Sequence, residues 1–215
     1  MSQWNEIYRK QGTGYKFYNI LQPHKDLGKV IALFKKAGAK RVLDLGCGAG
    51  RNLIPLAENG FDAYGIDQAS DGLKIAKREL SRRNLKAKLA KGNVFTNLPY
   101  KDGFFDALIS VQVMQHATPS RIKKGIAEMH RVLKPGGLAF ITLTGRISSG
   151  KVHRMLILTA RKIGDHLYIP QQGDEKGLVH FIYTKKLIYG HYSSFKILSL
   201  WIDEKGYYCF IARKD

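Results

Sequence analysis

The fold of this 215-residue chain is decided by the stretch Val42-Leu43-Asp44-Leu45-Gly46-Cys47-Gly48-Ala49-Gly50-Arg51-Asn52. Residues 41–45 favour a short buried strand, residues 46–50 a glycine-rich turn, and the apolar positions that follow a helix. Glycine lets the backbone approach a ligand closely, and the start of the next helix favours negative charge. The stretch therefore predicts a strand–turn–helix unit that holds a nucleotide-like ligand.

Strands and helices alternate on both sides of this unit. Apolar periodicity predicts helices over 24–37, 53–58, 71–83 and 119–133, and strands over 63–66, 87–90, 105–111 and 138–143, with a stop and turn at 134–137. This order is typical of a Rossmann-like, doubly wound, mostly parallel α/β sheet with right-handed crossovers.

The C-terminal part breaks the parallel pattern. Thr184 is placed to cap a helix that ends near His191, and residues 195–202 and 207–212 alternate as strands do. Because residues 203–206 form a short connection that ends in glycine, we expect an antiparallel hairpin.

The chain is long enough for one domain. We divide it into a helical N-terminal cap (1–37), a cofactor-binding core (40–145), an insertion (146–182), and a C-terminal helix with the hairpin (183–215). We expect the insertion to hold a helix and a long loop that acts as a lid, although a plain surface crossover is the alternative.

The chemistry around the turn restricts the ligand. A dinucleotide fingerprint needs a third glycine where this chain has Arg51, and Asp44 would repel a pyrophosphate, which disfavours an NAD-dependent oxidoreductase. S-adenosylmethionine instead carries an ammonium that Asp44 can bind. Its carboxylate can meet Arg51 and the backbone of Gly46, Cys47 and Gly48.

Further polar residues follow the next strands. Asp67 is placed to accept both ribose hydroxyls and Gln68 to line the adenine pocket. Asn93 can bind the exocyclic amine of adenine and the backbone of Val94 its ring nitrogens, while Val111 ends the fourth strand beneath the cofactor. Ligands of open α/β sheets bind at these strand ends, so together the residues predict one site.

These motifs resemble those of the class I S-adenosylmethionine-dependent methyltransferases. The resemblance covers about residues 40–145 and is carried by the stretches 42–50, 65–67, 92–94 with 98–100, 105–109 and 132–137. Asn93 departs from the commonest pattern, which has Asp there. The resemblance implies methyl transfer from S-adenosylmethionine, with S-adenosylhomocysteine as product.

Within that family, residues 50–52 and 56–62 and the N-terminal stretch 4–8 are similar to the type 11 and tellurite-resistance-like branch. That branch acts on small molecules. The stretch 177–181 resembles a segment of many uncharacterised members.

Methyl transfer needs a general base only when the acceptor arrives protonated. His116 follows the fourth strand and His180 follows the insertion loop, so both are candidates for that base. For each, the alternative is a structural histidine. Tyr8 can close over the cofactor, or it can simply dock an N-terminal helix.

The chain is strongly basic, with 36 Lys and Arg against 17 Asp and Glu and a formal net charge of +19. This charge, with the basic residues of 74–91, leaves an RNA (tRNA) methyltransferase open beside a small-molecule enzyme. A solvated helix face or a generally basic proteome explains it equally well. A non-catalytic nucleotide-binding partner subunit is a third possibility.

Cys47 and Cys209 lack the spacing of a zinc site, so no metal is expected, and we expect a reducing, cytoplasmic compartment. No stretch approaches the ~18 apolar residues of a membrane span.

Overall fold

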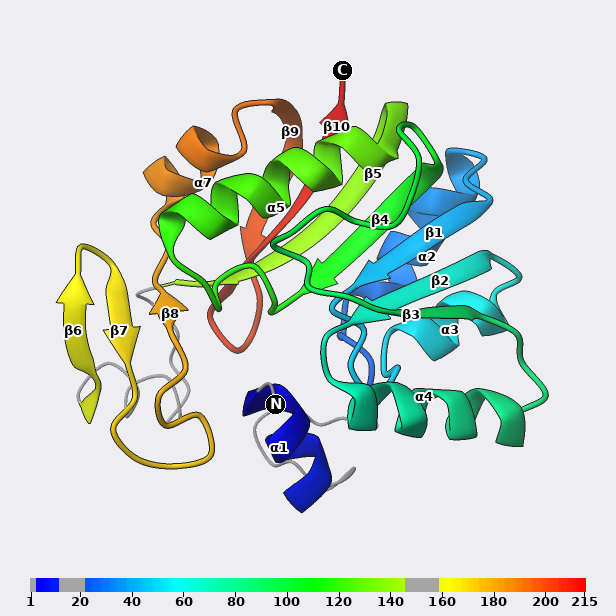
Figure 1. Cartoon of the computed structure of the whole chain (residues 1–215). Helices are drawn as coiled ribbons and strands as arrows, with labels where there is room; N and C mark the ends of the chain where they lie inside the picture. The colour runs from blue at the N-terminus through cyan, green and yellow to red at the C-terminus, as the bar shows by residue number, and fades with distance from the viewer. Residues whose placement is uncertain (1–2, 12–21, 146–158) are drawn as a thin grey trace.

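The computed structural model describes residues 3–11, 22–145 and 159–215. Its centre is a seven-stranded sheet with the order β3-β2-β1-β4-β5-β10-β9 (Figure 1). The strands are β1 (Arg41–Leu45), β2 (Asp62–Asp67), β3 (Lys88–Lys91), β4 (Phe105–Val111), β5 (Leu133–Thr144), β9 (Phe195–Ile202) and β10 (Tyr207–Lys214). Strands β1 to β5 are parallel, and β10 is antiparallel to both of its neighbours. The Rossmann-like fold and the antiparallel C-terminal hairpin are thus confirmed.

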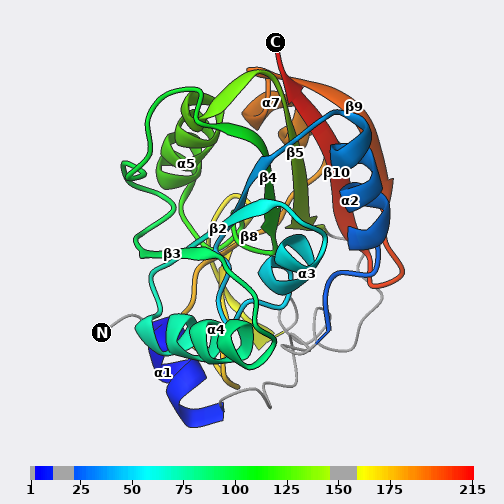
Figure 2. The same cartoon turned by 90° about the vertical axis from the view of Figure 1, so that its right-hand side faces the viewer.

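Helices cover both faces of this sheet (Figure 2). One face carries α2 (Leu27–Lys36) and α3 (Leu53–Glu58), with α4 (Ser70–Arg82) at its edge, and the other carries α5 (Pro119–Val132) and α7 (Lys185–His191). Successive side chains of a strand point to opposite faces, and β1 shows this directly. Leu43 and Leu45 lie in the core under α5, whereas Val42 lies in the core under α2 and α3.

The boundaries follow local signals. Gly46 starts the turn after β1 with φ 81°, and Gly60 follows α3 with φ 83°. The Thr184 side chain accepts a hydrogen bond from the Leu187 N–H at the start of α7, as a helix cap does.

Two segments differ from what the sequence predicts. Residues 134–137, expected as a turn, belong to the start of β5, where the pairing with β4 shifts register and Gly136 has φ 75°. A β-bulge in β5 therefore replaces the expected turn, and the strand continues through it.

Part of the predicted insertion forms a small sheet of its own. Its antiparallel strands are β6 (Arg161–Gly164), β7 (Leu167–Ile169) and β8 (His180–Phe181). The helix expected in this region falls largely on residues 146–158, outside the described residues. The sequence did not predict these strands, because each has only two to four residues and so shows almost no alternation.

Candidate active site

A cavity lies at the carboxyl ends of β1, β2 and β4. Its walls come from the glycine-rich turn, from Asp67 and Gln68 after β2, from the end of β4, and from helix α1 (Gln3–Gln11). In Figures 1 and 2, α1 lies beside α4, below these strand ends. This is the edge at which open α/β sheets bind ligands.

The glycine-rich turn is fixed by backbone hydrogen bonds to β2. The N–H groups of Gly46 and Cys47 both donate to the Ile66 carbonyl, at 2.8 and 3.1 Å. A Cβ on Gly46 would come within 2.5 Å of a Val113 methyl group, and its φ of 81° is strained for other residues. Glycine is therefore required where this turn passes the segment after β4.

Asp67 connects the turn to the start of α4. Its Oδ2 accepts the Gly48 N–H at 2.9 Å, and its Oδ1 accepts the Ala69 N–H at 2.7 Å. Burial raises the pKa of Asp67, while these backbone hydrogen bonds act in the opposite direction. Each carboxylate oxygen has a second lone pair, so the side chain can accept further hydrogen bonds in the cavity that it lines.

Asp44 lies buried beneath the turn, with 1% of its surface exposed. Burial raises the pKa of its carboxyl to about 7, although the nearby Arg51 guanidinium lowers it. Its Oδ2 has no hydrogen-bond partner among the described residues. Because an unsatisfied buried carboxylate oxygen is costly, it marks a place for a cationic donor.

The structure assembles most of the predicted cofactor residues. Around the cavity lie Gly46, Cys47, Arg51, Asp67, Gln68, Val94 and Val111. Asp44, Gly48 and Asn93 are not among the described residues that line it, and the Asn93 side-chain oxygen accepts the Phe95 N–H at 2.9 Å. The predicted adenine contact of Asn93 would share this oxygen. The sequence analysis did not assign Trp4, Asn52, Gly92, Phe95 and Val113, which also line the cavity.

Helix α1 covers the mouth of the cavity. Asn5 anchors it to α4: its Oδ1 accepts from Ser70 Oγ and the Asp71 N–H, and its Nδ2 donates to Asp71 Oδ2, all at 2.8 to 2.9 Å. Tyr8 packs so closely over the turn that a Cβ on Gly48 would collide with its hydroxyl. Burial raises the pKa of Tyr8.

Of the two predicted histidines, His116 lines the cavity, whereas His180 packs against it from behind the cavity wall. The ring centroids of His116 and His180 lie 4.7 Å apart, and Trp4 packs against the other side of His116 at 5.0 Å. His180 Nε2 lies 3.2 Å from Glu175 Oε2, and both side chains are buried. Burial and the charge of His180 lower the pKa of His116 to about 3, whereas Glu175 raises it. Glu175 could not be predicted from the sequence, because it lies in a loop without periodicity.

Gln112 has both a strained backbone conformation and a buried side-chain oxygen without a hydrogen-bond partner in the described residues. It follows β4 with φ 61°, an unusual conformation for a residue other than glycine. Its N–H donates to Thr142 Oγ1 at 2.9 Å, and its buried Oε1 makes no hydrogen bond within the described part of the chain. Strained residues often lie at functional sites, and Gln112 lines the cavity.

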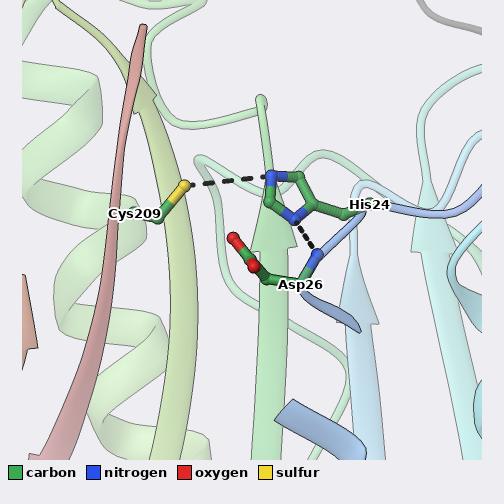
Figure 3. Close-up of side chains that lie close together, drawn as sticks. All are labelled: His24, Asp26 and Cys209. Atoms are coloured by element: carbon green, nitrogen blue, oxygen red, sulfur yellow. Dashed lines mark hydrogen bonds between the residues drawn. The ribbon is translucent and has the colours of Figure 1, made fainter. Parts of the chain in front are cut away.

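A second polar cluster joins the start of α2 to the C-terminal hairpin. His24, Asp26 and Cys209 lie close enough together to suggest a metal site (Figure 3). However, His24 Nδ1 accepts the Asp26 N–H at 3.2 Å, so the lone pair of the neutral ring is on Nδ1 and Nε2 carries the proton. Nε2 faces Cys209 Sγ at 3.8 Å and Asp203 Oδ2 at 3.3 Å. His24 thus joins Asp26, Asp203 and Cys209 in one hydrogen-bond network.

Comparison with known proteins agrees with this geometry. A family model described as a methyltransferase domain matches residues 42–137. These residues form a class I S-adenosylmethionine-dependent methyltransferase domain. An S-adenosylmethionine-dependent methyltransferase of Methanosarcina mazei superposes with a TM-score of 0.75 at 21% identity, over 90% of this chain and 99% of that one.

Relatives of this methyltransferase domain differ in their acceptors. An uncharacterized methyltransferase of Synechocystis is 33% identical over 99 residues, which are 46% of this chain and 44% of the relative. A tRNA N(3)-methylcytidine methyltransferase of Schizosaccharomyces pombe is 22% identical over 94% of this chain and 66% of the relative. The chain spans between 33% and 66% of the length of these and another curated relative.

The cofactor of this family is S-adenosylmethionine, and the residues present fit it. The unsatisfied oxygen of Asp44 suits an ammonium, and the turn passes close to Val113 without a side chain at Gly46. No helix in the described residues has the length and apolar character needed to cross a membrane.

Proposed function

We propose that the protein binds S-adenosylmethionine and transfers its methyl group to a small-molecule acceptor. One observation carries the proposal: the glycine-rich turn and Asp67 line one cavity together with residues of α1, and the buried Asp44 Oδ2 has no hydrogen-bond partner among the described residues. When bound, S-adenosylmethionine supplies a methyl group that its positive sulfur has already activated.

Each half of the cofactor has residues of fitting chemistry. Asp44 would hold the ammonium, Arg51 and the backbone of the turn the carboxylate, and Asp67 the ribose hydroxyls. Gln68 and Val94 would line the adenine pocket. The remaining task of the chain is to align the acceptor with the methyl group and to exclude water. Trp4 and Tyr8, which close the cavity from α1, are suited to exclude water.

The cover that α1 forms over the cavity favours a small acceptor. A polynucleotide acceptor is the second candidate, supported by the net charge of +19 and by the tRNA-modifying relative. The basic stretch 74–91 supports it less, because several of its cations are already paired with carboxylates. These pairs are Lys74–Asp71, Arg82–Glu79, Arg83–Glu58 and Lys88–Asp62.

Transfer of a labelled methyl group separates these candidates. The protein is incubated with methyl-labelled S-adenosylmethionine and either a protein-free small-molecule extract or total tRNA. We expect label in the small-molecule fraction and no salt-dependent binding of tRNA. Label in tRNA would establish the second candidate. Tight cofactor binding without transfer to either fraction would support a non-catalytic partner subunit.

The buried thiols Cys47 and Cys209 support a reducing, cytoplasmic location.

A further inference from the structure

We propose that Glu175, His180 and His116 form a proton-accepting chain beside the methyl-transfer position, so that the acceptor is a small molecule whose hydroxyl, amine or thiol still carries its proton. The inference rests on the proposed function and adds the chemical class of the acceptor. His116 would be the catalytic residue, whereas His180 and Glu175 would be positioning residues that act through it.

The three side chains come from two parts of the chain that meet at the cavity. His116 follows β4 and lines the cavity, while Glu175 in the loop before β8 and His180 at the start of β8 do not line it. The ring centroids of the two histidines are 4.7 Å apart, and His180 Nε2 lies 3.2 Å from Glu175 Oε2. A buried carboxylate, two imidazoles and the cavity thus lie next to one another, although His180 Nε2 makes no hydrogen bond within the described residues.

Backbone contacts hold this row in place. The Phe181 N–H donates to the Gln115 carbonyl at 2.7 Å, which fixes β8 beside the segment after β4. The Leu178 N–H donates to the Glu175 carbonyl at 3.0 Å and closes the loop between the acid and the histidine. Trp4 of α1 makes an edge-on contact with the His116 ring, with the ring centroids 5.0 Å apart. Such support restricts the rings to one arrangement, as a proton-transfer site needs.

Because these side chains are buried, the net charge of Glu175, His180 and His116 together matters for proton transfer. The Glu175 and His180 side chains are 6% and 5% exposed, and a lone buried carboxylate is strongly disfavoured. With both rings neutral the row carries one negative charge, and after accepting one proton it is neutral. The carboxylate favours a proton that arrives at His116 and partly offsets burial and the charge of His180, which lower the pKa of that ring to about 3.

The reaction balances with this one proton. The acceptor uses a lone pair to form its bond to carbon, the carbon–sulfur bond breaks with its electrons left on sulfur, and the proton of the acceptor passes to a ring nitrogen of His116. Gln112 adds a hydrogen-bond acceptor on the same cavity through its unsatisfied Oε1, which can hold a second donor group of the substrate. Neither role is needed for an acceptor that arrives without a proton.

The test uses His116→Asn, Glu175→Gln and His180→Gln, with His130→Asn on α5 as a matched control outside the cavity. Calorimetry with S-adenosylhomocysteine comes first, and we expect all variants to bind within about threefold of the wild type, since none is assigned to the cofactor. Failure of the wild type to bind would refute the proposed function itself. If the wild type binds S-adenosylhomocysteine, two other measurements decide whether Glu175, His180 and His116 accept a proton.

Methyl transfer is then measured at pH 7 to two pairs of probes. Each pair contains a phenol or a thiol that is protonated at this pH and a more acidic analogue that is mostly ionised. We expect kcat for the protonated probes to fall about 100-fold in His116→Asn and Glu175→Gln, with less than fivefold loss for the ionised probes, because general-base catalysis contributes 10²–10⁴-fold. An equal loss for both classes, or transfer to no protonated probe by protein that binds S-adenosylhomocysteine, overturns the inference.

A readout without turnover checks the row itself. Ring-nitrogen NMR of the S-adenosylhomocysteine complex, with the His116 signal assigned through His116→Asn, should show a neutral ring at pH 7. Thermal unfolding of Glu175→Gln, His180→Gln and the double variant should be non-additive, as expected for contacting residues. A charged His116 ring at pH 7, or additive melting shifts, contradicts the proton-accepting chain.

Discussion

The two sides of the cavity are built in different ways. The cofactor side comes from one continuous part of the chain, residues 42–94, and backbone hydrogen bonds such as Gly46 N–H to the Ile66 carbonyl fix its shape. The acceptor side is made of side chains from separate segments, including Trp4 on α1, His116 after β4, and His180 before the C-terminal hairpin.

This difference determines what each side can specify. A backbone-built turn presents the same N–H groups whatever side chains surround it, so it suits a ligand with fixed chemistry. A side-chain wall changes with single substitutions, so it suits the selection of an acceptor. We therefore expect substitutions on the cofactor side to change cofactor affinity, and those on the acceptor side to change transfer.

Asp67→Ala should have the largest effect. It removes the proposed ribose contacts and the two hydrogen bonds that connect Gly48 and Ala69. Hydrogen bonds to charged groups contribute about 1.5–3 kcal/mol each, so the affinity for S-adenosylhomocysteine should fall about 100-fold in calorimetry. His116→Asn serves as the acceptor-side control. If it weakens binding more than Asp67→Ala does, the division between the two sides is wrong.

Asp44 gives the cofactor side a pH dependence. Burial raises the pKa of its carboxyl to about 7, and the bound ammonium requires the ionised form. As pH rises from 5.5 to 7 the ionised fraction grows, so S-adenosylhomocysteine affinity should rise roughly tenfold. In Asp44→Asn the affinity should be about tenfold lower at pH 7 and nearly flat over this range. A wild-type affinity that is independent of pH would argue against an ammonium at Asp44.

Asp203 tests the His24 network, which joins the start of α2 to the C-terminal hairpin. Burial opposes the change, but the hydrogen bonds from His24 and from the backbone of Tyr207 and Lys205 lower the pKa of Asp203. A lowered folded-state pKa stabilises the protein above the unfolded value of about 3.9, and this stability is lost as pH falls through the folded value. Asp203→Asn should cost about 1 kcal/mol at pH 7 in urea unfolding and less near pH 3. A cost that stays constant down to pH 3 would exclude this explanation.

The smallest effect is expected at the junction of the two sides. Asn5→Ala removes the hydrogen bonds that anchor α1 to Ser70 and Asp71. Hydrogen–deuterium exchange should increase in residues 3–10 and cofactor affinity should fall about threefold, because hydrogen bonds at a partly exposed site contribute little net free energy. Unchanged exchange in α1 would mean that packing of Trp4 and Tyr8 holds the helix without this anchor.

The strands and the turn that form one side of the cavity could be predicted from the sequence because their signals are local. Strand β1, the glycine-rich turn and Asp67 lie within one strand–helix–strand unit, whose two strands are nearly continuous buried runs. The same locality explains why β4 and β9 have the predicted bounds.

The acceptor side could not be predicted to the same degree. His116 and His180 could be selected by residue type, but their contact depends on how β8 docks beside the segment after β4. Glu175 and the contact between His24 and Cys209 join residues that the sequence leaves unrelated, so neither has a spacing signal. The positive φ of Gln112 likewise arises from the bend after β4 and not from its residue type.

The central claim is that the cavity beneath α1 is built for S-adenosylmethionine. Isothermal titration of the wild-type protein with S-adenosylhomocysteine, and separately with NAD, tests it most directly. We predict saturable one-to-one binding of S-adenosylhomocysteine and no measurable binding of NAD, because Arg51 replaces the glycine that a dinucleotide site needs and Asp44 would repel a pyrophosphate. Tight binding of NAD with no binding of S-adenosylhomocysteine would contradict the account.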